Sequence, residues 1–139
     1  MTDKEGPLQV ITAIICDDVR REANGKDILI GVYGSGMRVE AIPHLIMLAF
    51  WLELKTFEIG SHEFSMRIMA PNEAIIFQSP PTRINVENIG FSHMALGGVP
   101  VQISTTGKME FQVSISGGEW KTVREIGVEV GPIVGQNPT

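Results

Sequence analysis

Apolar and polar side chains alternate without a break between residues 109 and 116. The apolar positions are Met109, Phe111, Val113 and Ile115. A period of two places these side chains on one face of a strand and the polar ones on the other. The pair Gly117-Gly118 follows at once, and a second strand-like run covers residues 120–130. This stretch therefore predicts an antiparallel hairpin with one buried face.

Short apolar or alternating runs, separated by glycine, proline or asparagine, recur along most of the chain. The clearest lie at residues 8–16, 63–70, 74–78, 83–87 and 99–103. Short strands at this spacing, about eight to ten in all, are typical of a sandwich or a barrel. We predict an all-β fold in the form of a two-sheet antiparallel β-sandwich, of immunoglobulin-like or C2/jelly-roll-like type.

The length of 139 residues suits a single domain. We place one β-sandwich domain at residues 8–130, between a flexible N-terminus at residues 1–7 and a flexible tail at residues 131–139. A chain of this size buries roughly 68% of its unfolded surface, so its fold needs no disulfide or metal. The single cysteine, Cys16, excludes an internal disulfide.

Two segments each allow two predictions. Residues 17–23 begin with aspartates that could cap a short helical turn, but the Asn24-Gly25 dipeptide that follows favours a type I′ hairpin turn. Residues 45–55 begin with a continuous apolar run, which suits a strand buried on both faces or a short buried helix. The bulky Phe50-Trp51 pair and the preceding Pro43 favour the strand. Its second face then needs a loop or a partner subunit to cover it.

The composition adds a prediction of self-association. Hydrophobic residues make up 43% of the chain and charged residues only 19%, and the mean hydropathy is +0.13. So little charge suggests more buried or partner-covered surface than a free monomer usually has. We expect a homodimer, with its interface on the two-faced apolar run at Leu45, Met47, Ala49 and Trp51.

Charge and hydropathy exclude two classes of partner. The net charge is −5 and the sequence pI is about 5.1, whereas nucleic-acid binding needs a basic face. The longest apolar stretch, residues 45–52, is far shorter than the roughly twenty residues of a membrane-spanning helix. The polar N-terminus has no apolar run of the signal-peptide type. We expect a cytoplasmic protein that binds neither nucleic acid nor membrane.

Asp17, Asp18 and Asp27 could form a loop-borne calcium site, because calcium prefers several carboxylate oxygens. However, neighbouring residues on a strand point to opposite faces, and no Asp-x-Asp repeat follows. We prefer a solvated strand end in which Asp17 or Asp18 pairs with Arg20 or Arg21. We expect no bound metal and no cofactor.

The three histidines, His44, His62 and His93, are too far apart in sequence for a helical or loop-borne zinc motif. A zinc site built from His44, His62 and Glu63 requires a tertiary contact. Cys16 follows an apolar strand and precedes two aspartates, which would raise its thiol pKa, so a buried small side chain is preferred over a nucleophile.

The segment at residues 31–36, Gly-Val-Tyr-Gly-Ser-Gly, does not have the spacing of a phosphate-binding loop, and no helix is expected after it. We expect these glycines to serve a turn and a bulge. Tyr33, Trp51 and Trp120 could line a sugar-binding face. Trp51 sits in the most apolar segment and is expected in the core, so Trp120, beside a glycine turn, is the preferred ligand contact.

From Cys16 to Tyr33 the chain reads Cys-Asp-Asp-Val-Arg-Arg-Glu-x-Asn-Gly-Lys-x-x-Leu-Ile-Gly-Val-Tyr. This opening resembles that of a family of small uncharacterised bacterial proteins of unknown function. The similarity continues at residues 60–64 and at the Pro71-Asn72 turn. The resemblance implies a single-domain β-sandwich in the bacterial cytosol, and it brings no activity and no catalytic residues.

We therefore expect a non-enzymatic β-sandwich that acts by protein–protein contact and self-associates. A small-molecule or carbohydrate-binding sandwich is the alternative. A metal-dependent hydrolase built from His44, His62, Glu63 and the aspartates is a second one. The charged segment at residues 17–26 is the predicted recognition hairpin. Its candidate contact residues are Asp17, Asp18, Arg20, Arg21 and Lys26.

Overall fold

The computed structural model describes residues 6–132, which form eleven strands and no helix. The all-β prediction is confirmed. The strands are β1 (Leu8–Cys16), β2 (Asp18–Arg21), β3 (Asp27–Ile30), β4 (Gly36–Val39), β5 (His44–Thr56), β6 (Gly60–Met69), β7 (Ile75–Gln78), β8 (Thr82–Val86), β9 (Gly90–Ile103), β10 (Gly107–Ile115) and β11 (Lys121–Val130). Most of the two predicted flexible termini, residues 1–5 and 133–139, lies outside the described residues.

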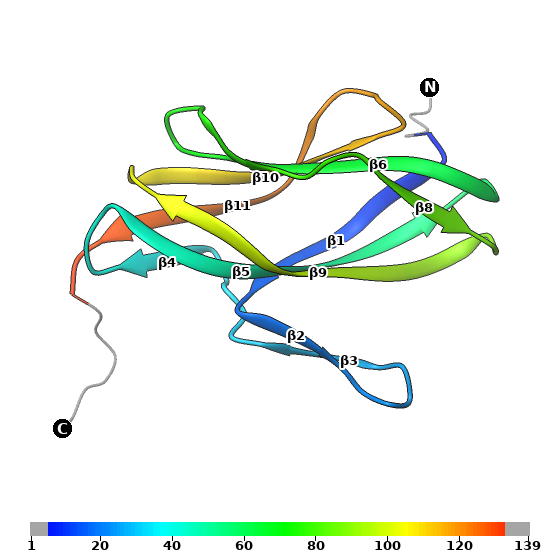
Figure 1. Cartoon of the computed structure of the whole chain (residues 1–139), viewed down its shortest axis with the longest axis horizontal. Coiled ribbons are helices and arrows are strands. Elements are labelled where there is room, and N and C mark those ends of the chain that lie inside the picture. The colour runs from blue at the N-terminus through cyan, green and yellow to red at the C-terminus, as the bar shows by residue number, and fades with distance from the viewer. Residues whose placement is uncertain (1–5, 133–139) are drawn as a thin grey trace.

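Two sheets face each other across a shared core (Figure 1). The first has the order β1-β5-β9, and the second has the order β4-β11-β10-β6-β7, with β8 also paired to β6. The pair β4–β11 is parallel, and the other strand pairs are antiparallel. Phe50 of β5 and Phe111 of β10 meet in the core, with ring centroids 4.6 Å apart.

The alternation in residues 109–116 does what the sequence predicts. Met109, Phe111 and Val113 are each at most 2% exposed and belong to the core. Glu110 and Gln112 are half-buried outside that core and hydrogen-bond to each other. Burial of these apolar side chains, together with those of the facing sheet, is the main force that holds the two layers together.

The ambiguous apolar run at residues 45–55 is a strand, as predicted. β5 lies at the centre of its sheet, paired with β1 on one side and β9 on the other. Four of its side chains enter the core: Leu48, Phe50, Leu52 and Leu54. Because side chains alternate along a strand, Ala49 and Trp51 lie on the outer face of the sheet.

The structure differs from the predicted architecture in two details. It has eleven strands in three sheets, because β2 and β3 pair only with each other. Residues 99–103, expected as a strand of their own, are the last part of the longer strand β9. Gly97-Gly98 opposes Ala49 as a β-bulge within this strand, and the φ of 67° at Gly98 suits glycine.

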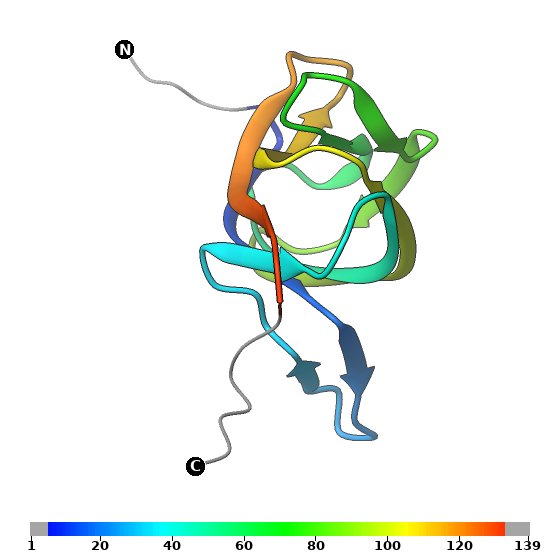
Figure 2. The same ribbon diagram turned by 90° about the vertical axis from the view of Figure 1, so that its left-hand side faces the viewer.

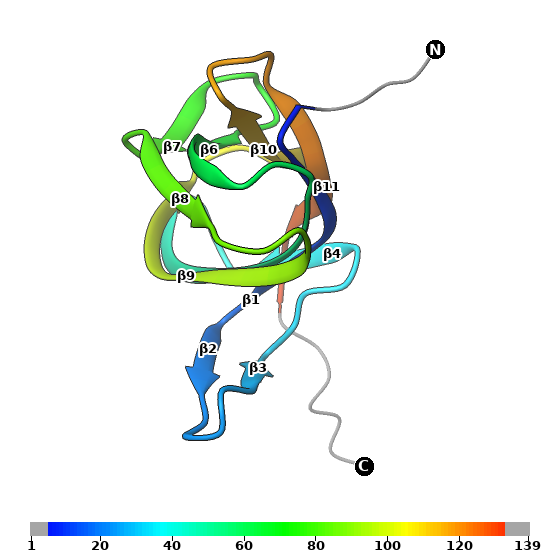
Figure 3. The same ribbon diagram turned by 90° about the vertical axis from the view of Figure 1, so that its right-hand side faces the viewer.

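β2 and β3 form a hairpin on the outer side of the β1-β5-β9 sheet (Figures 2 and 3). Its ladder runs from the pair Asp18–Ile30 to the pair Arg21–Asp27. The predicted hairpin is therefore confirmed over the short helical turn. Within residues 6–132, no helix is long and apolar enough to cross a membrane.

Candidate functional site

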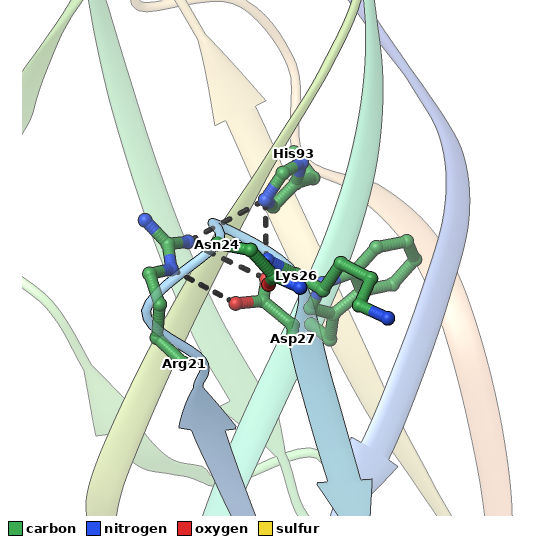
Figure 4. A network of polar contacts seen from close by, with 6 residues as sticks. Arg21, Asn24, Lys26, Asp27 and His93 are labelled. Carbon is green, nitrogen blue, oxygen red and sulfur yellow. Dashed lines mark hydrogen bonds and ion pairs between the residues drawn. The ribbon is translucent and has the colours of Figure 1, made fainter.

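The Asp27 carboxylate joins this hairpin to the sheet behind it (Figure 4). Its Oδ1 accepts a hydrogen bond from Arg21 Nε at 2.9 Å, and its Oδ2 accepts one from Trp51 Nε1 at 3.0 Å. The Nε2 atom of His93 lies 3.1 Å from the same Oδ2. We call these four residues, from β2, β3, β5 and β9, the Asp27 anchor.

The other contacts of the Asp27 anchor complete a closed network. The rings of Trp51 and His93 stack with their centroids 5.9 Å apart and an interplanar angle of 23°. A terminal nitrogen of Arg21 lies 3.4 Å from His93 Nε2 and 3.4 Å from Asp27 Oδ2. The Asp27 side chain is only 6% exposed as a result. A buried carboxylate needs such partners, because burial without them is costly.

The sequence of the hairpin explains why Asp27 reaches this position. Gly25 has a φ of 92°, which the turn requires and glycine allows. The Asn24 side chain accepts a hydrogen bond from the backbone N–H of Lys26, and the N–H of Glu22 donates to the carbonyl of Lys26. The turn fixes the register in which Arg21 and Asp27 stand opposite each other.

The hydrogen bond from Arg21 is the main reason why the pKa of Asp27 lies below its ordinary value. Partial desolvation acts in the opposite direction, and the Trp51 indole and the charges of Arg21 and His93 lower the pKa further. The carboxylate is therefore held in its ionised form, in which it accepts every one of these hydrogen bonds.

An Asp–His pair also occurs in hydrolytic triads, where the histidine activates a nucleophile. Among residues 6–132, however, no hydroxyl or thiol hydrogen-bonds to His93. The acceptor atoms of Asp27 are occupied by groups of the hairpin and the sheet. The geometry thus suits the positioning of a structural element better than the binding of a substrate.

The remaining charged residues of the predicted recognition hairpin have separate partners. Asp18 Oδ2 lies 2.8 Å from Arg20 Nε, and Lys26 pairs with Glu22 at 3.7 Å. Asp17 accepts a hydrogen bond from the Tyr33 hydroxyl at 3.0 Å. The three aspartates considered for calcium therefore do not converge, and the described part of the chain holds no group of three acidic, histidine or cysteine residues placed for a metal.

Tyr33 lies beyond the hairpin, where it forms an isolated bridge with Ile15 of β1. Burial of its ring and the nearby Asp17 raise the pKa of Tyr33 to about 12. Gly31 lies directly after β3 with a φ of 70°, and a Cβ there would collide with the Asp17 side chain. Gly31 thus suits the bend after β3, as expected, whereas Gly36 begins β4.

The predicted interface run is divided by the hairpin. Leu45 and Met47 are 63% and 53% exposed, as an interface requires, but Ala49 is completely buried. Trp51 is half-buried and bonded to Asp27. The prediction is therefore wrong for Ala49, which is buried within the chain itself. For Trp51 it stays a prediction, because that side chain is half-buried and bonds to the β2–β3 hairpin through Asp27.

Trp120 is half-buried, and the Arg67 guanidinium lies 4.3 Å from the centre of its ring. Arg67 also donates a hydrogen bond to Gln112 at 2.8 Å. A tryptophan covered in this way on one ring face has only its other face left for stacking against a sugar. The ligand contact at Trp120 stays a prediction.

The residues considered for a zinc site are dispersed. His44 begins β5, whereas His62 and Glu63 follow the end of that long strand, on β6. His62 contacts the carbonyl of Glu58, and His93 belongs to the Asp27 anchor. Cys16 is fully buried, and burial raises its thiol pKa, in agreement with the preferred interpretation.

Sequence reasoning named Arg21 as a contact residue but missed its link to Asp27, Trp51 and His93. Trp51 and His93 lie 30 and 72 positions from Arg21 in the sequence. Asp27 is nearer, but only the register of the hairpin places it opposite Arg21. The usable local signal was the Asn-Gly turn, which places Arg21 opposite Asp27. No local pattern indicated that the hairpin would lie against β5 and β9.

A comparison with curated proteins finds no match to this chain. A family model described as a family of unknown function, DUF6941, matches residues 11–129. The match includes the hairpin, the Asp27 anchor and nearly all of both large sheets. The chain therefore belongs to the DUF6941 family of unknown function.

Proposed function

We propose that this protein is a non-enzymatic interaction module that self-associates and uses the β2–β3 hairpin as its recognition element. The observation that carries the proposal is the Asp27 anchor. A two-stranded hairpin is marginally stable alone in water, and here a nearly buried carboxylate holds it against a rigid sheet. A hairpin fixed in this way presents the same surface to each partner, which lowers the ordering cost of binding.

The outward face of the hairpin supports a role in contact with a protein. Ile28 and Ile30 are 44% and 41% exposed. Their cross-strand neighbours are Arg20 and Asp18, which pair with each other. Apolar side chains next to both signs of charge are typical of surfaces that bind other proteins through a small apolar centre with a polar rim.

Site-specific photo-crosslinking tests this proposal. A photoreactive amino acid replaces Ile28 in one variant and Ile75, which is 50% exposed on β7, in a matched control. Irradiation in cells that naturally produce the protein is expected to give a discrete adduct from position 28 and none from position 75. Adducts of equal yield from both positions, or none from position 28, would contradict the role of the hairpin.

A cleft of about 450 Å³ favours small-molecule binding as a second candidate function. It lies between β4 and the start of β5, and its lining combines apolar Met37 and Ile46 with Tyr33, Arg38 and His44. A volume in this range suits a small ligand. Nuclear magnetic resonance with a fragment library tests this candidate, which requires shifts confined to these residues.

The finer classification of the fold belongs to the same proposal. We treat the two large sheets as a sandwich of the immunoglobulin-like or C2/jelly-roll-like kind, with the hairpin as an addition to it. We also propose a cytoplasmic location, consistent with a single cysteine that is buried and unpaired.

A further inference from the structure

Two neighbouring turns place three strongly exposed, large apolar side chains at one end of the molecule. Phe91 is 66% exposed, Ile59 65% and Ile89 63%. Ile59 lies in the turn between β5 and β6, and Ile89 lies in the turn between β8 and β9, where Phe91 follows (Figure 1). We call the surface formed by residues 55–59 and 87–91 the tip surface.

Thr56 holds the two turns of the tip surface together. Its hydroxyl lies 3.1 Å from the carbonyl of Asn88 and 2.9 Å from that of Gly90, and it accepts a hydrogen bond from the N–H of Gly90 at 3.0 Å. The Thr56 side chain is buried beneath the turns. These hydrogen bonds therefore hold together the two turns that carry the exposed apolar side chains.

The tip surface carries both signs of charge around its apolar centre. The Lys55 ammonium lies 5.5 Å from the centre of the Phe57 ring and 5.8 Å from that of Phe91. Glu58 and Glu87 are exposed in the two turns. An interface between two identical copies related by a two-fold axis must be complementary to itself, and a surface with lysine and glutamate around an apolar centre meets this condition.

The other candidate surface for self-association has fewer exposed apolar side chains. In the expected interface run Ala49 is buried and Trp51 is half-buried, which leaves only Leu45 and Met47 exposed there. An anionic membrane is a poor partner for the tip surface, because one lysine stands beside two glutamates.

We infer that the tip surface is the self-association interface, and that its occupant is the tip surface of a second copy. This inference rests on the self-association in the proposed function and names its surface. In the dimer, Ile59, Ile89 and Phe91 of the two copies pack together. Lys55 of each copy faces Glu58 and Glu87 of the other.

Sedimentation velocity of charge-reversed chains tests the inference. One variant carries Lys55→Glu, and the other carries Glu58→Lys with Glu87→Lys. In each variant alone, side chains of like charge face each other across the two-fold axis. The dissociation constant of its dimer is therefore expected to rise at least about tenfold. An equimolar mixture of the two variants restores opposite charges across the interface. It is expected to form a heterodimer at the protein concentration at which the wild-type chain dimerises.

A pair of apolar variants separates the possible outcomes. Ile59→Ser with Ile89→Ser is expected to weaken the wild-type dimer at least about tenfold, because it removes the centre of the contact. The matched control, Leu45→Ser with Met47→Ser, is expected to leave it unchanged. A dimer that persists in the tip variant overturns only the inference about the tip surface. A wild-type chain that stays monomeric at all concentrations overturns the proposed self-association itself.

Discussion

At the residue scale, the molecule depends on a few polar side chains that are largely buried and hydrogen-bonded to their neighbours. Asp27 is the clearest case, because its two oxygens contact groups of three other strands. Asp18 has a similar ion pair with Arg20 at 2.8 Å, but both side chains are exposed. The two aspartates lie on the same hairpin and differ mainly in burial, so they form a natural comparison.

The Asp27→Asn substitution is expected to loosen the hairpin. It removes the charge that Arg21 pairs with, and it places an amide N–H₂ where a donor already points. Hydrogen exchange of the amides in residues 18–30 is expected to accelerate, whereas exchange in β10 stays slow. The Asp18→Asn control is expected to change neither region, because exposed ion pairs contribute little. Equal effects of the two substitutions would contradict the anchor.

The raised pKa of Tyr33 predicts that the folded state loses stability at high pH. This pKa is raised from 10.0 to about 12 in the folded chain, so the folded state retains the proton that the unfolded chain loses. This contribution to stability is complete below pH 10 and is lost as the pH rises toward 12. Urea denaturation between pH 9 and pH 12 measures it. The Tyr33→Phe variant is expected to lose less stability across this range than the wild type, and an identical decline would contradict the assignment.

At the element scale, the sequence predicts most strands but few of their tertiary relations. The alternation in residues 109–116 and the Asn24-Gly25 turn each lead to the right element, because strand period and turn geometry are local properties. The parallel pair β4–β11 and the packing of the hairpin on β5 and β9 join residues far apart in the chain. No local pattern encodes such contacts. The same limit explains the incorrect placement of Ala49 in an interface.

The bulge in β9 gives a matched test of two neighbouring glycines within one strand. Gly98 has a φ of 67°, which is unfavourable for a residue with a Cβ, whereas the φ of Gly97 is not in this range. A Cβ at either position meets open space. Gly98→Ala is therefore expected to lower the free energy of unfolding by about 1 kcal/mol. Gly97→Ala is expected to change it by less than about 0.5 kcal/mol. Chemical denaturation measures both, and a larger effect at Gly97 would contradict the bulge geometry.

At the scale of the whole molecule, two layers enclose one core and leave their recognition features outside it. The core cluster includes side chains of β1, β4, β5, β6, β9, β10 and β11. The hairpin and the tip surface stand on the outer side and at one end of this scaffold. The hydrophobic pattern anticipated the core side chains of β10. It did not anticipate which apolar residues stay exposed, because Ile59 and Ile89 lie in turns that have no periodicity.

Phe111 tests how strongly the two layers depend on each other. Its ring is 1% exposed and meets the ring of Phe50 from the facing sheet. Phe111→Ala is expected to lower the free energy of unfolding by about 3–5 kcal/mol, because it removes buried contacts and leaves a cavity. The control Ile75→Ala, at a position that is 50% exposed, is expected to cost much less. Equal costs in thermal or chemical denaturation would mean that the core is not shared between the layers.

The measurement that tests the central claim most directly is light scattering coupled to size-exclusion chromatography, with wild-type protein over a wide range of concentrations. The account of this chain as a self-associating interaction module predicts that the measured mass rises from that of a 15.2 kDa monomer toward twice that mass as the concentration increases. A mass that stays at 15.2 kDa into the high micromolar range would contradict it.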